Sequence, residues 1–284
     1  MPFTFTFTKY YLIRQKHYDK VVEYAREDEM KKSKWKKFRP DSNEALEAAP
    51  GTKNTSRKGN MEPYYSHAGI TIYNCDCRLI LPTLPKCDLL LTDPPYLVHA
   101  GAGGGCFGNR DHLVETGDFT DGGCDYSFLD PFHNWFVFCS RRQLPELIPW
   151  ALKRERWNLI TWCKPNPVQT CNNKYLPDVE YIVHGFSGGR LFGEMADKQA
   201  FILHPCGNKE TDHPNEKPLT VIAKLIRLGT QEGETIIDPF MGSGSILIAA
   251  RNLGRNAIGI DTEEKWCECA AKRLSQEVFD FTAD

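Results

Sequence analysis

The segment Leu89-Leu90-Leu91-Thr92-Asp93-Pro94-Pro95-Tyr96 joins an apolar run to an abrupt stop. The run is typical of a buried strand, and the two prolines end it because proline donates no backbone hydrogen bond. Asp93, a proline carbonyl and Tyr96 would then meet at the carboxyl end of a strand, where open α/β sheets bind ligands. Two acceptors and a ring suit a planar group with an exocyclic amine. A strand-ending turn with no ligand is the alternative interpretation.

A second motif lies near the C-terminus. Glu234–Ile237 is typical of a strand, and it leads into Asp238-Pro239-Phe240-Met241-Gly242-Ser243-Gly244-Ser245. A helix at Ile246–Leu253 and a strand at Asn256–Ile260 follow, and Asp261 ends the strand. Strand, glycine turn, helix, strand and acid predict a βαβ nucleotide-binding unit, whose glycines admit a ligand and whose acid accepts hydrogen bonds from ribose hydroxyls.

The glycine motif is incomplete as a dinucleotide fingerprint. Leu247 occupies the position of the third glycine of GxGxxG. The pattern therefore favours a smaller cofactor that carries one ribose.

The intervening chain alternates between strand and helix patterns. We expect strands at Gly69–Tyr73, Trp157–Trp162 and Val179–His184, and helices around Leu79–Leu84, Arg142–Lys153 and Leu219–Thr230, with a last helix carrying Trp266, Ala270 and Leu274 on one face. Two segments break the pattern. The five glycines of Ala100–Gly108 predict a loop, either a lid or a plain surface loop. Residues 185–212 are irregular and predict a small substrate-recognition insertion or a connecting loop.

Composition indicates an ordinary globular protein. The 284 residues are 41% apolar and 25% charged, enough for one large domain or two small ones. No run approaches the roughly 18–20 apolar residues of a membrane span, and the alternating Phe and Thr of residues 3–8 do not resemble a signal peptide. The 11 cysteines form no paired CxxC motifs, so we expect reduced thiols, no metal and a cytoplasmic location.

The first 60 residues differ from the rest of the chain. They hold 14 Lys and Arg against 8 Asp and Glu, a net charge of +6, whereas the remaining 224 residues hold 21 against 29, a net charge of −8. We therefore expect a basic extension and linker at 1–60 and a catalytic domain at 61–284. The cluster of lysines around Trp35 is either a solvated helix face or a patch that binds nucleic-acid phosphates.

The two motifs together resemble those of the DNA methyltransferases that methylate amino groups with S-adenosylmethionine. The order, with Asp93-Pro94-Pro95-Tyr96 first and the glycine turn last, resembles the permuted β class of that family. The resemblance covers Met61 to about Gln276, and segments at 162–167, 175–181 and 213–218 add to it. It implies a Rossmann-like methyltransferase fold: a mostly parallel, twisted sheet with helices on both faces and a circularly permuted motif order.

The resemblance also implies roles for individual residues. A base flipped out of the duplex would stack on Tyr96, while Asp93 and the Pro94 carbonyl accept the hydrogens of its amine. The catalytic set is Asp93, Pro94, Pro95 and Tyr96. The cofactor-binding set is Asp76, Asn215, Lys217, Asp238, Pro239, Phe240, Gly242, Ser243, Gly244, Ser245 and Asp261. Lys217 would contact the cofactor carboxylate or serve the fold. Cys75, Ser245 and Asp261 stand where the family more often has Gly, Thr and Glu.

The nature of the substrate rests on the first residue of the catalytic motif. Asp93 favours adenine N6 in double-stranded DNA, because Ser is commoner at this position in enzymes that methylate cytosine N4. A protein-glutamine methyltransferase and a DNA-binding module with a degenerate site would also fit parts of the pattern. Lys164, Lys174, Arg190 and the N-terminal cluster are the expected DNA contacts. Homodimer formation and a restriction partner stay open.

Overall fold

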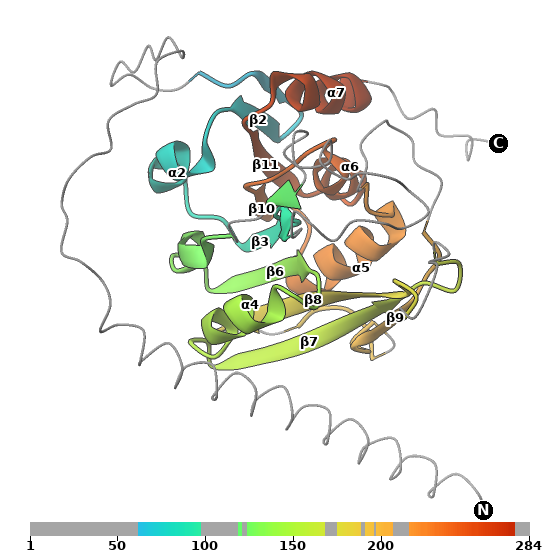
Figure 1. Cartoon of the computed structure of the whole chain (residues 1–284). Coiled ribbons are helices and arrows are strands. Elements are labelled where there is room, and N and C mark those ends of the chain that lie inside the picture. The colour runs from blue at the N-terminus through green and yellow to red at the C-terminus, as the bar shows by residue number, and fades with distance from the viewer. Residues whose placement is uncertain are drawn as a thin grey trace, which may run out of the picture. The chain divides into compact units, whose positions relative to one another are not determined.

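A nine-stranded sheet forms the centre of the computed structural model, which describes residues 62–97, 119–120, 124–167, 175–188, 191–195, 197–206 and 216–275 (Figure 1). The strand order is β1-β2-β11-β10-β3-β6-β8-β7-β9. The strands are β1 (Tyr65–His67), β2 (Ile70–Asn74), β3 (Leu89–Thr92), β6 (Asn134–Cys139), β7 (Arg156–Cys163), β8 (Val179–Phe186), β9 (Phe201–Leu203), β10 (Thr235–Asp238) and β11 (Asn256–Asp261). A separate parallel pair joins β4 (Tyr96–Leu97) to β5 (Phe119–Thr120).

The sheet is mostly parallel, as the sequence predicts. Strands β2, β11, β10, β3 and β6 run in one direction, and β7 pairs in parallel with β9. Only β1 and β8 among the strands of this sheet run antiparallel to their neighbours. Parallel strands in this arrangement are covered on both faces, which explains their nearly continuous apolar sequences.

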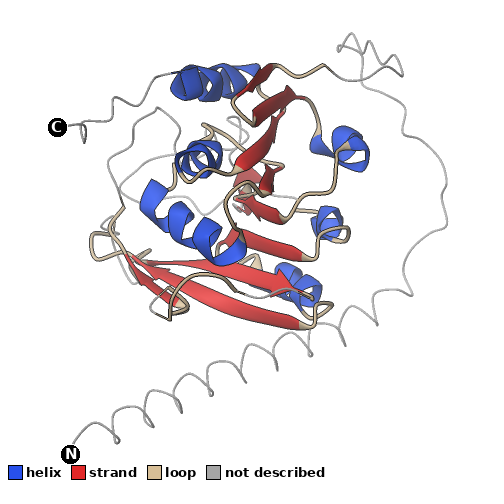
Figure 2. Ribbon diagram, turned by 180° about the vertical axis from the view of Figure 1, so that it is seen from behind, coloured by secondary structure: helices blue, strands red, loops and turns tan. Residues whose placement is uncertain are grey.

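Helices cover both faces of the sheet (Figure 2). One face carries α5 (Leu219–Gly229), α6 (Ser245–Asn252) and α7 (Glu264–Ser275), and the other carries α2 (Cys77–Ile80), the short 3-10 helices η2 (Leu81–Thr83) and η3 (Tyr126–Leu129), and α4 (Leu144–Ala151). The α5–α7 face buries Leu89 and Leu91 of β3, whereas Leu90 points the other way and is equally buried.

Close packing of α6 on the sheet depends on a glycine in the strand. A Cβ atom on Gly259 of β11 would lie 2.7 Å from a methyl carbon of Leu247 and 2.6 Å from the sulfur of Met241. In a complete GxGxxG motif the third glycine, on the helix, allows this approach. Here Leu247 fills that helix position, and Gly259 provides the space from the strand side.

The segment 185–212 differs from the prediction in part. We expected irregular chain, but Gly185 and Phe186 continue β8, and Phe201–Leu203 forms β9 at the edge of the sheet. A three-residue strand among glycines and charged residues leaves no recognisable pattern in the sequence. This strand forms because it pairs with β7. The expected loop at 100–108 and the extension at 1–60 lie outside the described residues.

Two further findings concern the described residues. No helix among them is both long and apolar enough to cross a membrane. Their cysteines, which range from buried to exposed, form no disulfide bonds with one another.

A buried histidine stacks between two aromatic rings in the sheet. The His184 ring lies 3.9 Å from that of Phe136 and 4.3 Å from that of Phe186, between ring centroids. Desolvation lowers the pKa of His184 to about 3, and the charge of Arg156 acts in the same direction. His184 therefore stays neutral in the folded protein.

Because His184 is neutral in the folded protein, we expect the free energy of unfolding to fall in acid. Below about pH 6.5 the unfolded chain protonates His184 but the folded protein does not, so the free energy of unfolding falls by up to about 1.4 kcal/mol per pH unit towards pH 3. His184→Gln should remove this contribution. Urea unfolding between about pH 4.5 and pH 7 measures it, and equal slopes for the two proteins would contradict the prediction.

Candidate active site

The two sequence motifs meet because their strands are neighbours. β3 and β10 pair in parallel, so Asp93 and Asp238 emerge at the same edge of the sheet. The Thr92 Oγ1 donates a 2.6 Å hydrogen bond to Asp238 Oδ1, which joins the two strand ends directly. Asp261 ends the next strand, β11. Three acids thus stand at the carboxyl ends of adjacent parallel strands, the expected place for a ligand.

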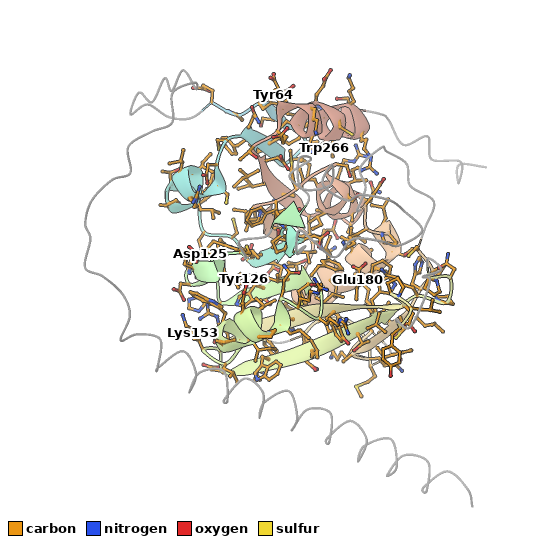
Figure 3. All side chains as sticks on the ribbon, viewed as in Figure 1. Tyr64, Asp125, Tyr126, Lys153, Glu180 and Trp266 are labelled. Atoms are coloured by element: carbon orange, nitrogen blue, oxygen red, sulfur yellow. The ribbon has the colours of Figure 1, made fainter. Side chains whose placement is uncertain are left out.

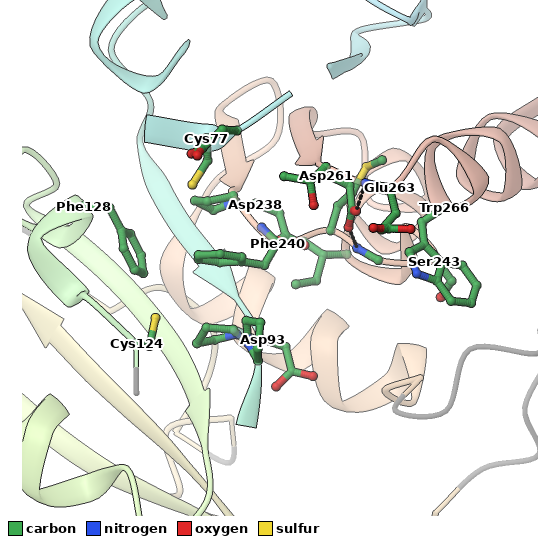
Figure 4. A pocket seen from close by; sticks show the side chains of 18 of the residues that line it. Cys77, Asp93, Cys124, Phe128, Asp238, Phe240, Ser243, Asp261, Glu263 and Trp266 are labelled. Atoms are coloured by element: carbon green, nitrogen blue, oxygen red, sulfur yellow. Dashed lines mark hydrogen bonds between the residues drawn. The ribbon is translucent and has the colours of Figure 1, made fainter. Parts of the chain in front are cut away.

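A cavity of about 440 Å³ lies at this edge (Figure 4). This volume falls within the usual range of small-molecule sites, about 300–1,000 Å³. Its lining includes, from the predicted set, Asp76, Asp93, Pro94, Pro95, Lys217, Asp238, Pro239, Phe240, Gly242, Ser243, Ser245 and Asp261. Residues far apart in the sequence therefore share one cavity.

Burial changes the acidity of Asp238. The side chain is almost completely buried, and desolvation raises its pKa to about 7 even though Thr92 and the Phe240 N–H donate hydrogen bonds to it. The charges of Asp93 and Asp261 act in the same direction as desolvation. Asp238 therefore changes protonation state near neutral pH. A cationic ligand group beside it would stabilise its ionised form.

The glycine turn is held in place by Asp261. The Gly242 N–H donates to Asp261 Oδ2 at 3.0 Å, and the Glu263 N–H donates to Oδ1 at 2.8 Å. Gly242 and Gly244 both have positive φ angles, 49° and 79°. Gly244 does not line the cavity; a Cβ atom there would lie 2.7 Å from the Cβ of Ala270 on α7. A glycine is needed at this position because of the positive φ angle and the close approach of α7.

Asp93 forms a buried ion pair with a lysine that precedes α5. Lys217 Nζ lies 2.5 Å from Asp93 Oδ2 and 3.5 Å from Glu180 Oε2. Glu180 on β8 (Figure 3) also pairs with Lys164. The expectation that Lys164 contacts DNA is therefore wrong. Its side chain is only 11% exposed, and it already forms an ion pair with an acidic residue. Lys174 and Arg190 lie outside the described residues.

A buried glutamine fixes the proline turn. Gln143 Nε2 donates to the Pro95 carbonyl at 3.2 Å and lies at the same distance from the Tyr126 hydroxyl oxygen. The Gln143 Oε1 accepts from the Ser140 N–H and hydroxyl. The Pro95 carbonyl is therefore engaged by the protein. Tyr96 begins β4 and pairs with Phe119.

Aromatic rings border the cavity on two sides. Phe128 meets Phe240 edge to face, with 5.4 Å between ring centroids, and Trp266 of α7 lies towards Asp261 and Glu263 (Figure 4). Asp76 caps α2 by accepting from the Arg78 N–H and pairs with the Arg78 side chain. The cavity thus combines apolar ring surfaces with carboxylates, a usual composition for small-molecule sites.

A second buried ion pair supports the turn from α7. Arg273 pairs with Glu216 at 2.8 Å and donates to the Ser243 carbonyl, also at 2.8 Å. Both side chains are at most 10% exposed. Arg273 therefore ties the glycine turn to the residue that precedes Lys217.

The predicted site residues that the structure describes line the cavity, with the exception of Gly244, but about half of the lining was not predicted. Asn215 and the Tyr96 side chain lie outside the described residues, and Gly244 stands outside the lining. The unpredicted lining residues include Phe128 and Trp266. The prediction also misses Gln143, Glu180 and Arg273, which do not line the cavity but contact residues that do. Helical spacing could have found Arg273, which follows Trp266 and Ala270 on α7. Gln143 and Glu180 act through distant partners and leave no local signal.

Asp238 should lower the stability of the ligand-free protein at neutral pH. Its pKa is about 7 when folded and 3.8 ordinarily, so between those values the folded state holds a proton that the unfolded chain has lost. Stability therefore falls as pH rises through this window, by up to about 1.4 kcal/mol per unit. Asp238→Asn keeps the acceptor for Thr92 and should raise Tm, more at pH 8 than at pH 5. Exposed Asp130→Asn is the control, and a constant Tm difference would contradict the prediction.

Comparisons with known proteins agree with this geometry. A profile of a DNA methylase family, N6_N4_Mtase, matches residues 87–273, about two thirds of the chain. The Type II methyltransferase M2.DpnII of Streptococcus pneumoniae is 27% identical over 252 residues, which cover 76% of this chain and 93% of that protein.

Solved structures extend the similarity to three dimensions. The crystal structure of the M1.HpyAVI–SAM complex has a TM-score of 0.53 at 26% identity, over 72% of this chain and all of that one. The PvuII cytosine-N4-specific DNA methyltransferase has a TM-score of 0.54 at 13% identity, over 77% and 90%, and supports the fold alone. The resemblance drawn from the sequence is confirmed: this chain belongs to the DNA methylase family of N6 and N4 methyltransferases.

Proposed function

We propose that this protein transfers a methyl group from S-adenosylmethionine to the exocyclic N6 amine of an adenine in double-stranded DNA. The observation that carries the proposal is that Asp93, at the end of β3, and the glycine turn after β10 line the same cavity. A group bound at the turn and an amine bound at Asp93 would therefore lie next to each other.

The lining fits the cofactor by charge. S-adenosylmethionine carries a sulfonium and an ammonium against one carboxylate, and acidic side chains outnumber basic ones around the cavity. The acids are Asp76, Asp93, Asp125, Glu216, Asp238, Asp261 and Glu263, against Arg78 and Lys217. When bound, the cofactor supplies an electrophilic methyl group.

Individual residues would hold different parts of the cofactor. Asp238 and the Gly242–Ser243 turn would hold its amino-acid end, and Asp261 its ribose. An ionised carboxylate has about four acceptor positions. Asp261 can therefore keep its bonds to the turn and still accept from a hydroxyl. The raised pKa of Asp238 suits the same role, because an arriving ammonium would favour the ionised form.

The chain's own residues would activate the target amine. Asp93 and the Pro94 carbonyl accept its two hydrogens and localise the nitrogen lone pair. With the cofactor bound, the nitrogen would take its methyl group as the carbon–sulfur bond breaks, and one proton would then pass from the nitrogen to solvent. Positive charge develops on the nitrogen, so an ionised Asp93 stabilises the transition state more than the ground state. Alignment of two bound reactants can contribute about 7–11 kcal/mol.

Adenine is favoured over cytosine because Asp stands first in the Asp93 motif, where Ser is commoner in cytosine-N4 enzymes. The permuted order is supported by the position of β3 before β10 along the chain, although the two strands are neighbours in the sheet. The acidic catalytic domain would gain affinity for DNA from the net charge of +6 on residues 1–60.

Product analysis tests the reaction. Purified protein incubated with S-adenosylmethionine and mixed-sequence duplex DNA should yield N6-methyladenine on mass spectrometry of the digested nucleosides. Asp93→Ala should bind the cofactor with unchanged affinity and lose turnover by at least about 10²-fold, as for other groups that stabilise developing charge. Asp130→Ala, an exposed acid, is the matched control. N4-methylcytosine would overturn the base assignment, and normal turnover by Asp93→Ala would overturn its role.

Deletion of residues 1–60 tests the extension separately. The truncated protein should keep its methyl transfer at saturating DNA but bind DNA more weakly. The slope of log affinity against log salt should become flatter, because fewer phosphates are neutralised. Fluorescence anisotropy at several salt concentrations measures both quantities. Unchanged affinity and slope would remove the extension from DNA binding.

A further inference from the structure

Four charged side chains from four elements form an alternating chain that ends at Asp93. The order is Lys164 after β7, Glu180 on β8, Lys217 before α5 and Asp93 after β3. Their side chains are between 7% and 18% exposed. Two cations and two anions balance to zero, which matters because unpaired charge is costly at this depth.

Lys217 stands between the two acids. Its ammonium group has three hydrogens and can donate to both, and Nζ lies 2.5 Å from Asp93 Oδ2 and 3.5 Å from Glu180 Oε2. Glu180 does not line the cavity, so it could reach the target amine only through Lys217. Lys164 pairs with the other carboxylate oxygen of Glu180, Oε1, and limits the positions that Glu180 can take.

Other titratable groups face Asp93 from the neighbouring strands. Cys139 on β6 and Asp238 on β10 both interact electrostatically with it. Each of these groups is neutral or negative, so neither stabilises an ionised Asp93. The cation at Lys217 opposes them.

We propose that Lys217 and Glu180 are positioning residues for the methyl transfer. Lys217 holds the Asp93 carboxylate ionised and oriented towards the amine, and Glu180, held by Lys164, fixes Lys217. The inference rests on the proposed function and assigns Lys217 to the substrate side of the cavity. The competing assignment, in which Lys217 binds the cofactor carboxylate, makes a different prediction for cofactor affinity.

Charge-balance variants separate these assignments. Lys217→Met leaves an excess negative charge, so one carboxylate of the pair should hold a proton at neutral pH. The acid limb of the rate–pH profile should move to higher pH by about 1–3 units. Lys217→Arg keeps the cation and should keep the limb near its wild-type position. Lys217→Met with Glu180→Gln restores the balance and should return the limb towards wild type, a rescue that a purely structural lysine would not give.

Three measurements on each full-length variant complete the test: initial methylation rate against pH, S-adenosylmethionine affinity by calorimetry, and Tm over the same pH range. We expect cofactor affinity within about threefold of wild type, a change worth less than about 0.7 kcal/mol. The Tm deficit of Lys217→Met should grow as pH rises from 5 to 8, and Glu180→Gln should reduce that growth. Lys153→Met breaks the exposed pair with Asp130 and is the matched control, with no shift expected.

The outcomes are distinct. A Lys217→Met protein with an unshifted acid limb and at least tenfold weaker cofactor binding would assign Lys217 to the cofactor and overturn the inference. A shift that Glu180→Gln does not reverse would overturn the role of Glu180. A flat response of both rate and Tm would overturn the whole inference. Absence of N6-methyladenine from the wild-type reaction would refute the proposed function instead, and the Tm series would still test the charge pairing.

Discussion

The hydrogen bond from Thr92 to Asp238 joins the two halves of the site. It connects the ends of neighbouring parallel strands, and each strand end carries one of the sequence motifs. Asp93 follows Thr92 directly, while the glycine turn follows Asp238, so the distance between the two motifs is set by the spacing of adjacent strands. Arg273 and Gln143 then hold the two turns from opposite faces of the sheet. The cavity is a consequence of this strand pairing.

Two acids side by side experience opposite environments. Asp238 accepts hydrogen bonds from the neutral donors Thr92 and Phe240 and has no cation among the groups that shift its pKa, so burial, with the nearby charges of Asp93 and Asp261, raises that pKa to about 7. Asp93 is paired with a buried lysine, which favours its ionised form. Neighbouring carboxyl groups with different protonation behaviour are a common way to divide tasks within one site. Here the division would follow the two motifs: burial favours the protonated form of Asp238, and the ion pair with Lys217 favours the ionised form of Asp93.

Most of the sheet and about half of the cavity lining could be predicted because their signals are local. β3 and β10 are apolar runs stopped by Asp-Pro, and α5 repeats its apolar residues at helical spacing. The remainder depends on contacts between distant segments. β9 forms because it pairs with the edge of β7. Gly259 supplies the space that Leu247 needs. Lys217 contacts Asp93 only because the chain before α5 passes the end of β3. Gly244 is the reverse case. The local motif identifies it as a site residue, but its close neighbour in the fold is Ala270 on α7 and it does not line the cavity.

The order of the strands along the chain also has a consequence for biosynthesis. β3 is central in the sheet, but its partner β10 begins at Thr235, so the ribosome must make most of the protein before the pair can form. Until then Leu89, Leu90 and Leu91, all fully buried in the finished fold, have only β6 beside them. Pairing between strands so far apart in the sequence is slow, and until it occurs the apolar strand edges are exposed to aggregation. The centre of the sheet can therefore be completed only after β10 has been synthesised, and a nascent chain that stops before β10 leaves β3 without one of its two partner strands.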